Sequence, residues 1–233
     1  SFQDQLTSVT EFIEKNIDTT KKNILIGHSF AAQLLYRVLP LAQENIDEVI
    51  LISPCLSLNL LDKNLKKKKK KDFSQQGKSE GEKIGQLLEK VSDVFDEKRS
   101  ELLGFIFQDE NLFGHYWQNQ EQMLRYFSFL QGEYSLDLES FWEVRKTAPM
   151  KLEGNQICTP TRFLFGKNDP ITPSSTAGPL CKEFFPNSTV SIFEEAAHYP
   201  HLESANTFIE WLVAPYREKT KPAESSDFVA SLR

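Results

Sequence analysis

Two short apolar runs with one helical pattern between them constrain the fold of this chain most. Residues 23–26 and 48–53 are rich in Ile, Leu and Val without alternation, which is typical of strands buried on both faces of a parallel sheet. The apolar spacing between them predicts a helix that ends near Pro40. A strand, a helix and a second strand within about 30 residues form a right-handed βαβ unit. The sequence therefore predicts an α/β fold with a mostly parallel sheet.

The same alternation returns near the carboxyl end of the chain. Residues 161–166 and 188–193 are two further predicted strands, and helical patterns cover residues 177–185 and 203–212. An amphipathic pattern over residues 2–17 adds a helix at the amino end. Four strands are therefore expected in one sheet.

The segment between these two halves has a different pattern and is predicted to form a helical cap. Lys66 to Lys71 is an unbroken lysine run, so residues 62–82 are expected to be a mobile, solvated loop. Between Leu102 and Trp142 lie 11 of the 27 Phe, Trp and Tyr residues. Helical patterns in this segment lie near residues 83–98, 110–131 and 137–147. The expected domains are a core of residues 1–55 and 157–213, a cap of residues 56–156 and a tail of residues 214–233.

The composition argues against several classes of protein. Mean hydropathy is −0.42 and the sequence holds no run of roughly 18 apolar residues, so no membrane span is expected. The net charge of −6 argues against a nucleic-acid partner. The three cysteines are far apart, so neither a disulfide framework nor a zinc ribbon is expected, and a reducing, cytoplasmic location is favoured.

The strongest candidate for chemistry is Ser29, in the sequence Gly-His-Ser-Phe-Ala between the first predicted strand and its helix. A sharp strand-to-helix turn needs small residues two positions before and after its apex, and Gly27 and Ala31 meet that need. Such a turn exposes the serine at a helix N-terminus, where N–H groups and partial positive charge favour a developing anion. The backbone N–H of Phe30 is the expected oxyanion donor.

A serine becomes a nucleophile when a base held by an acid activates it. Asp169 follows the predicted strand at residues 161–166, and His198 follows the one at residues 188–193. The carboxyl ends of parallel strands share one edge of the sheet, where open α/β folds bind ligands. Ser29, Asp169 and His198 are therefore expected to meet at that edge, in the chain order serine, acid, histidine.

These motifs resemble those of the α/β-hydrolase superfamily, in the branch that carries a helical cap. The similarity rests on residues 27–31, 165–173 and 195–203. It implies a serine hydrolase with Ser29 as nucleophile, Asp169 as acid and His198 as base, acting on a small-molecule acyl substrate without a metal or an organic cofactor. A mainly apolar substrate pocket is expected, with lining residues His28, Trp117, Phe127, Trp142 and Tyr199.

The resemblance also indicates what this chain lacks. Members of the superfamily have an eight-stranded sheet and a second oxyanion donor after the third strand, whereas this chain begins at the helix before the fifth strand. The strand at residues 23–26 is therefore expected to be an exposed apolar edge. The chain is interpreted as a fragment of a longer protein, or as half of a complex in which a second chain supplies the missing strands.

The candidate residues also have other interpretations. Asp169 precedes Pro170 and could be a turn residue, and His198 could be a buried histidine. His198 and His201 have the spacing of a zinc pair, but no third ligand stands at a recognised spacing, so no metal site is expected. The alternative function is a catalytically silent scaffold used as a binding or regulatory module. Among enzymes, one triad supports cleavage of esters, amides or carbon–carbon bonds and acyl transfer.

Overall fold

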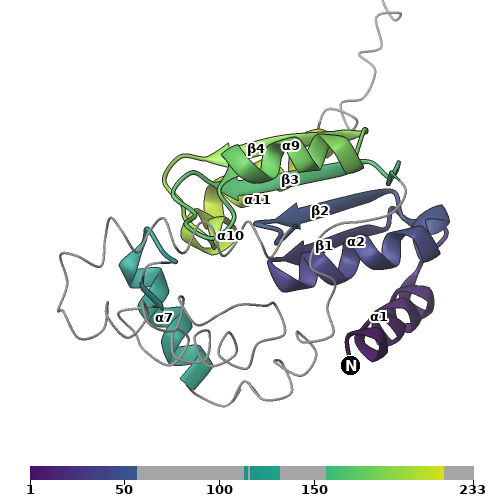
Figure 1. Cartoon of the computed structure of the whole chain (residues 1–233), viewed down its shortest axis with the longest axis horizontal. Helices are drawn as coiled ribbons and strands as arrows, with labels where there is room; N and C mark the ends of the chain where they lie inside the picture. Colours follow the sequence, from purple (N-terminus) through teal and green to yellow (C-terminus); the bar gives the residue numbers. More distant parts are fainter. Residues whose placement is uncertain (57–112, 115, 132–155, 218–233) are drawn as a thin grey trace, which may run out of the picture.

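The strands form one parallel four-stranded sheet in the computed structural model, which describes residues 1–56, 113–114, 116–131 and 156–217. They lie side by side in the order in which they occur in the chain (Figure 1). The predicted α/β fold is therefore confirmed. The strands are β1 (Ile24–His28), β2 (Glu48–Ile52), β3 (Thr161–Gly166) and β4 (Ser188–Phe193).

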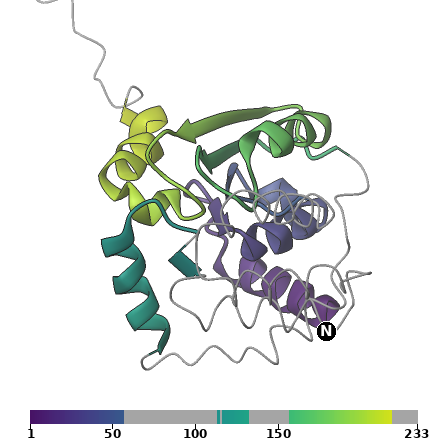
Figure 2. The ribbon, with the colours of Figure 1, turned by 60° about the vertical axis from the view of Figure 1, so that its left-hand side comes forward.

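Helices cover both faces of the sheet, as a buried parallel sheet requires. The helices of the described residues are α1 (Phe2–Asn16), α2 (Phe30–Ala42), η1 (Gln43–Asn45), α7 (Gln120–Gln131), α9 (Ser174–Phe184), α10 (Pro200–Glu203) and α11 (Ala205–Arg217). On one face lie α2 and α9, with α1 packed against α2, and on the other lies α11 (Figure 1). Helix α7 lies apart from the sheet, on the same side as α10 (Figure 2).

Alternate residues of the central strands fill two separate cores. Val49 and Leu51 of β2 pack with Phe163 toward α2 and α9. Ile50 and Ile52 point to the other face and pack against α11. Every residue of β2 is buried, which explains the unbroken apolar run at residues 49–52.

The strand that precedes Ser29 lies at the edge of the described sheet. β1 pairs with β2, from Ile24 opposite Glu48 to His28 opposite Ile52. The side chain of Ile26, in the middle of β1, is 49% exposed. An exposed apolar residue on an edge strand is what the sequence predicted for this position.

Helix α2 extends past the proline at which it was predicted to end. It continues to Ala42, with Pro40 inside its last turns. Pro40 lacks the N–H that would donate to the Tyr36 carbonyl, but Tyr36 and Leu39 are almost completely buried. Their packing in the core holds the final turn, because tertiary contacts supply most of the stability of a protein helix.

The helix predicted at residues 203–212 is in fact two helices, α10 and α11. The second continues through Pro215, past the predicted start of the tail at residue 214. Arg162 of β3 donates from Nη1 to the carbonyl of Trp211 at 2.9 Å, in the middle of α11. This carbonyl has no donor within the helix, because Pro215 lacks an N–H, and the arginine takes the place of the missing bond. The contact comes from a strand distant in sequence, which a local pattern does not reveal.

The helical pattern predicted at residues 110–131 is interrupted in the structure. The chain turns at residues 116–119, and α7 begins only at Gln120. The side chain of Asn119 accepts a hydrogen bond from the N–H of Gln122 at 3.1 Å, the contact of an N-cap residue. The apolar spacing continues across this turn, so the periodicity alone predicts one continuous helix.

Part of the predicted cap lies outside the residues that the structure describes. The lysine-rich loop at residues 62–82, the helical patterns at 83–98 and 137–147, and Trp142 all lie there, so the cap stays a prediction. Within the described ranges, no helix combines the length and the apolar character needed to cross a bilayer.

Candidate active site

Ser29 forms the tight turn between β1 and α2, with a backbone φ of 52°. This left-handed conformation is uncommon for a residue with a side chain. It is held by the sheet, because the Ser29 N–H donates to the Ile52 carbonyl at 2.9 Å. A Cβ atom on Gly27 would lie 2.7 Å from Leu35 Cδ1 and 2.9 Å from the backbone nitrogen of Ala32. Glycine at position 27 therefore allows the strand and the helix to approach as closely as the turn requires.

Phe30 follows Ser29 as the first residue of α2. N–H groups in the first turn of a helix point out of its N-terminus, which places the N–H of Phe30 next to the serine in the chain. The aromatic ring of Phe30 packs edge-on against Phe2, with 6.1 Å between ring centroids. Its ring thus belongs to the packing of α1 on α2, and its backbone is the part that faces the turn.

His198 connects the serine to the carboxylate, and the three predicted residues are brought together. His198 Nε2 lies 3.1 Å from Ser29 Oγ, and His198 Nδ1 lies 2.9 Å from Asp169 Oδ2. Because an ionised carboxylate can only accept, Nδ1 carries the proton and donates to Asp169. Nε2 is then free to accept the Ser29 hydroxyl proton. Both the carboxylate and the imidazole are buried.

Asp169 is held as an anion in spite of its burial. Burial opposes the charge, but the positive potential of His198, its hydrogen bond and those from Thr172 lower the pKa of Asp169 to about 2. The second carboxylate oxygen, Oδ1, accepts the N–H groups of Ile171 at 2.8 Å and Thr172 at 3.0 Å. The Thr172 hydroxyl donates to Oδ2 at 2.6 Å. Asp169 therefore does more than make a turn before Pro170, because its Oδ2 also binds the imidazole.

The loops that carry Asp169 and His198 are in direct contact at Gly166, the last residue of β3. A Cβ atom there would lie 1.9 Å from the carbonyl oxygen of Ala197, so a larger residue would push the two loops apart. The Asn168 N–H donates across the same gap to the Ala196 carbonyl at 3.0 Å. These contacts set the separation at which the carboxylate reaches the imidazole.

Two further histidines lie next to His198. His28 Nε2 lies 2.8 Å from the His198 carbonyl oxygen, and the rings of His28 and His201 are 4.7 Å apart. Burial, together with the nearby His198 and His201, lowers the pKa of His28 well below its ordinary value. Burial and His198 lower the pKa of His201 from 6.5 to about 4. Both side chains are therefore neutral at pH 7.

Because these histidines are neutral in the folded protein, we expect the protein to lose stability in mild acid. Between pH 6.5 and about 4, unfolded His201 binds a proton that folded His201 does not, so the free energy of unfolding falls as pH falls. At pH 5 the protonation of His201 in the unfolded chain lowers the free energy of unfolding by roughly 2 kcal/mol. Urea unfolding of the parent and of His201→Gln at pH 7 and pH 5 measures it. The variant should lose less stability than the parent over this step, and equal losses would show that His201 titrates normally.

Trp117 and Tyr199, two of the predicted pocket residues, stack beside His198. Their ring centroids are 4.2 Å apart and their planes differ by 11°. Tyr199 also packs against the rings of His198 at 5.3 Å and of His28 at 4.8 Å. His28, Trp117 and Tyr199 are thus placed together at the histidine that faces Ser29.

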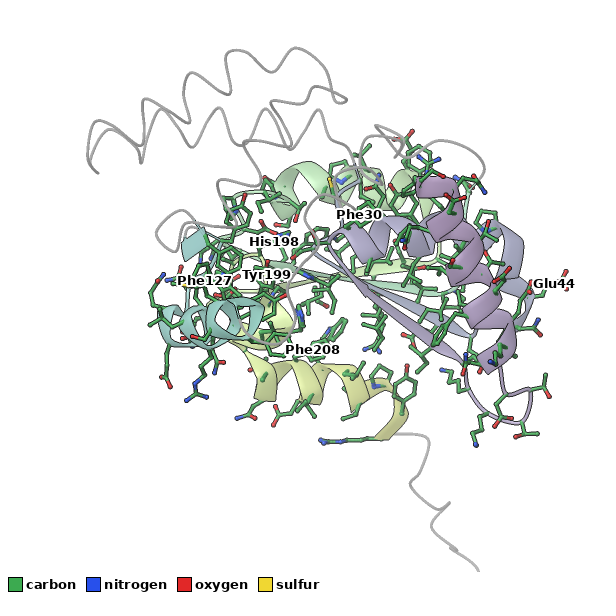
Figure 3. The ribbon with its side chains drawn as sticks, turned by 90° about the horizontal axis from the view of Figure 1, so that it is seen from below. Phe30, Glu44, Phe127, His198, Tyr199 and Phe208 are labelled. Carbon is green, nitrogen blue, oxygen red and sulfur yellow. The ribbon has the colours of Figure 1, made fainter. Side chains whose placement is uncertain are left out.

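Phe127 of α7 is partly buried and reaches this group through a second ring. Its centroid lies 5.7 Å from that of Phe113, which is 6.1 Å from Tyr199. Figure 3 shows Phe127, Tyr199 and His198 at the end of the molecule where α7 lies, opposite Glu44. Trp142, the remaining predicted pocket residue, lies outside the described residues.

The sequence reasoning missed three residues that hold this site. Thr172 could have been found, because an Asp followed three positions later by Thr is a common local hydrogen-bonding pattern. Tyr116, whose carbonyl accepts the N–H of His198 at 2.9 Å, gives no such signal. Glu203 also gives none, because half of its partners lie about 85 residues earlier in the chain.

A zinc pair of His198 and His201 is not favoured by this geometry. Both ring nitrogens of His198 are taken up by Ser29 and Asp169. Among the residues that the structure describes, no group of three or more His, Cys, Asp or Glu side chains is placed to hold a metal ion.

Comparison with known proteins relates the chain to the α/β-hydrolase fold. Residues 2–205 match the family model described as the alpha/beta hydrolase fold. A pimeloyl-[acyl-carrier protein] methyl ester esterase from Legionella pneumophila (strain Corby) is 36% identical over 76 residues. This aligned segment is 33% of the present chain and 29% of the esterase.

Solved structures resemble the chain over most of its length. An esterase from Exiguobacterium antarcticum is 15% identical with a TM-score of 0.55, over 92% of this chain and 73% of that chain. The structure of a thermophilic esterase is 15% identical with a TM-score of 0.60, over 94% of this chain and 73% of the other. At this identity, the likeness shows the shared fold.

Proposed function

Because the chain belongs to the α/β-hydrolase fold family, we propose that it is a serine hydrolase that cleaves an ester or related acyl bond. The observation that carries the proposal is the chain of contacts from Asp169 through His198 to Ser29. A module that only binds would not need a serine in a strained turn, facing a histidine whose proton position is fixed by a buried carboxylate. That combination disfavours a catalytically silent scaffold.

In the proposed reaction, Ser29 Oγ attacks the acyl carbonyl carbon while His198 Nε2 takes its proton. The carbonyl oxygen becomes an oxyanion, which the backbone N–H of Phe30 stabilises. The imidazolium then protonates the leaving alcohol, the carbon–oxygen bond breaks, and an acyl-enzyme remains. A water molecule, deprotonated by the same Nε2, hydrolyses that ester and restores Ser29. Asp169 keeps the proton on Nδ1 and stabilises the imidazolium throughout.

We place the apolar part of the substrate against the aromatic side chains near His198. Trp117 and Tyr199 are both buried, and they lie beside the histidine at which the acyl bond would be cleaved. The carboxylate of Glu203, which bonds the backbone beside these rings, is taken up by four backbone N–H groups. A cationic group on the substrate would therefore find this carboxylate already bonded. The name of the Legionella relative, a methyl ester esterase, favours an ester over the other acyl bonds.

A series of p-nitrophenyl esters from acetate to octanoate tests both the activity and the polarity of the site. In the full-length protein, kcat/KM should rise with the length of the acyl chain until the pocket is full. Each methylene should lower the activation free energy by up to about 0.8 kcal/mol. A p-nitrophenyl ester with a terminal carboxylate is the matched control and should react more slowly than the uncharged ester of equal length. A preference for acetate that declines steadily with length would show that the aromatic rings fill the pocket rather than line it.

A further inference from the structure

Glu203, the last residue of α10, binds four backbone N–H groups with one carboxylate. Its Oε1 accepts from Ala197 at 2.9 Å and from Tyr199 at 3.2 Å, the two residues that flank His198. Its Oε2 accepts from Asn119 at 3.0 Å and from Gln118. Glu203 thus joins the loop of His198 to the segment that leads into α7.

The same two segments are joined by two contacts that do not involve Glu203. The His198 N–H donates to the Tyr116 carbonyl at 2.9 Å, and the rings of Trp117 and Tyr199 stack. The backbone of residues 197–199 is therefore bonded on one side to residues 116–119. On its other side the His198 carbonyl contacts His28 in β1. The imidazole is therefore carried by a loop that is held between residues 116–119 and the sheet.

The surroundings of the Glu203 side chain require that both of its terminal oxygens accept hydrogen bonds. All four partners are donors, and Glu203 is only 9% exposed. A glutamine of the same shape would turn an NH2 group toward two of the four N–H groups, leaving one pair without an acceptor. Buried donors without partners are costly, so the loop of His198 or the segment before α7 would have to shift.

We propose that Glu203 is a positioning residue, which fixes His198 Nε2 opposite Ser29 Oγ by tying the histidine loop to the segment before α7. This inference rests on the proposed serine hydrolase function and adds a residue that touches neither the substrate nor the reacting atoms. It also assigns a role to residues 116–119. They hold the base, in addition to presenting Trp117 to the substrate.

The test combines active-site labelling with steady-state kinetics in the full-length protein. A fluorophosphonate probe is followed over time in the parent and in Glu203→Gln. The final stoichiometry counts folded, competent sites, and the rate constant reports how well His198 activates Ser29. The constants kcat and KM for p-nitrophenyl butyrate are measured alongside. Glu195→Gln, an exposed carboxylate in the same loop, is the matched control.

In Glu203→Gln, kcat and the labelling rate constant should fall about ten- to a hundredfold, the size expected for a displaced catalytic group. The stoichiometry should stay near that of the parent, KM should change less than about threefold, and Glu195→Gln should match the parent. An unchanged rate constant, with or without a lower stoichiometry, would reduce Glu203 to a structural role and overturn the inference.

Two further outcomes separate this inference from the proposed function. If Glu203→Gln does not accumulate as folded protein, Glu203→Asp is measured in the same way. It keeps the carboxylate but withdraws it by one methylene, so a rate constant equal to that of the parent would overturn the inference. A parent protein that neither reacts with the probe nor hydrolyses any ester contradicts the proposed function itself.

Discussion

Replacing Ser29 with alanine is expected to lower kcat by about 10⁶ without unfolding the protein. The hydroxyl is the attacking group in the proposed reaction, and it is the group that lies 3.1 Å from His198 Nε2. The turn itself is held by backbone contacts and by Gly27, which the substitution leaves intact. The measurement is the hydrolysis rate of the best ester of the series, with thermal unfolding as the check on folding.

Ser53 provides a matched control for this substitution. It is also a serine with positive φ, at 42°, it is buried, and it lies at the end of the neighbouring strand β2. Ser53→Ala should retain activity within about tenfold of the parent, since alanine changes only a group outside the proposed reaction. Residual activity of Ser29→Ala within the same tenfold range would remove Ser29 from the mechanism.

Asp169→Asn is expected to lower kcat by about 10⁴. An asparagine side chain can present its NH2 group to His198, which favours the tautomer with the proton on Nε2 and leaves no base facing Ser29. The pKa of the parent carboxyl is about 2, so Asp169 is ionised at every pH at which an assay is practical. The ratio of parent to variant kcat should therefore stay large across the pH range, as measured with one ester from pH 5 to pH 9.

Glu194→Gln is the control for the loss of one carboxylate near this edge of the sheet. Glu194 forms a salt bridge with Lys167, and both side chains are largely exposed. Such pairs contribute little to stability, so kcat should be unchanged. A silent Asp169→Asn would mean that another carboxylate orients the histidine.

The strands could be predicted because their burial requires apolar residues that are adjacent in the sequence. β2 and β3 are buried at every position, and each contains an unbroken apolar run, at residues 49–52 and 163–165. The ends of helices were less predictable. Pro40 and Pro215 are ordinary stop signals, but Tyr36 in the core and Arg162 in β3 hold the turns that contain them. Those contacts arise from the tertiary fold.

Some residues of the candidate site could likewise be predicted from the sequence, and others could not. Ser29, Asp169 and His198 could be predicted because each lies in the loop or turn that follows a strand of one parallel sheet, and topology alone brings them to a common edge. Glu203 could not, because its partners at residues 118 and 119 become neighbours only when the chain turns before α7. The aromatic spacing that suggested one long helix concealed that turn.

The most direct test of the central claim, that Ser29 is an activated nucleophile, is to locate a fluorophosphonate adduct by mass spectrometry after proteolysis. We expect one adduct per chain, on the peptide that contains Ser29. Prior incubation with a slowly hydrolysed ester should slow its formation, and Ser29→Ala should abolish it. An adduct on a different residue, or ester hydrolysis at the parent rate in protein that stays unlabelled, would contradict the claim.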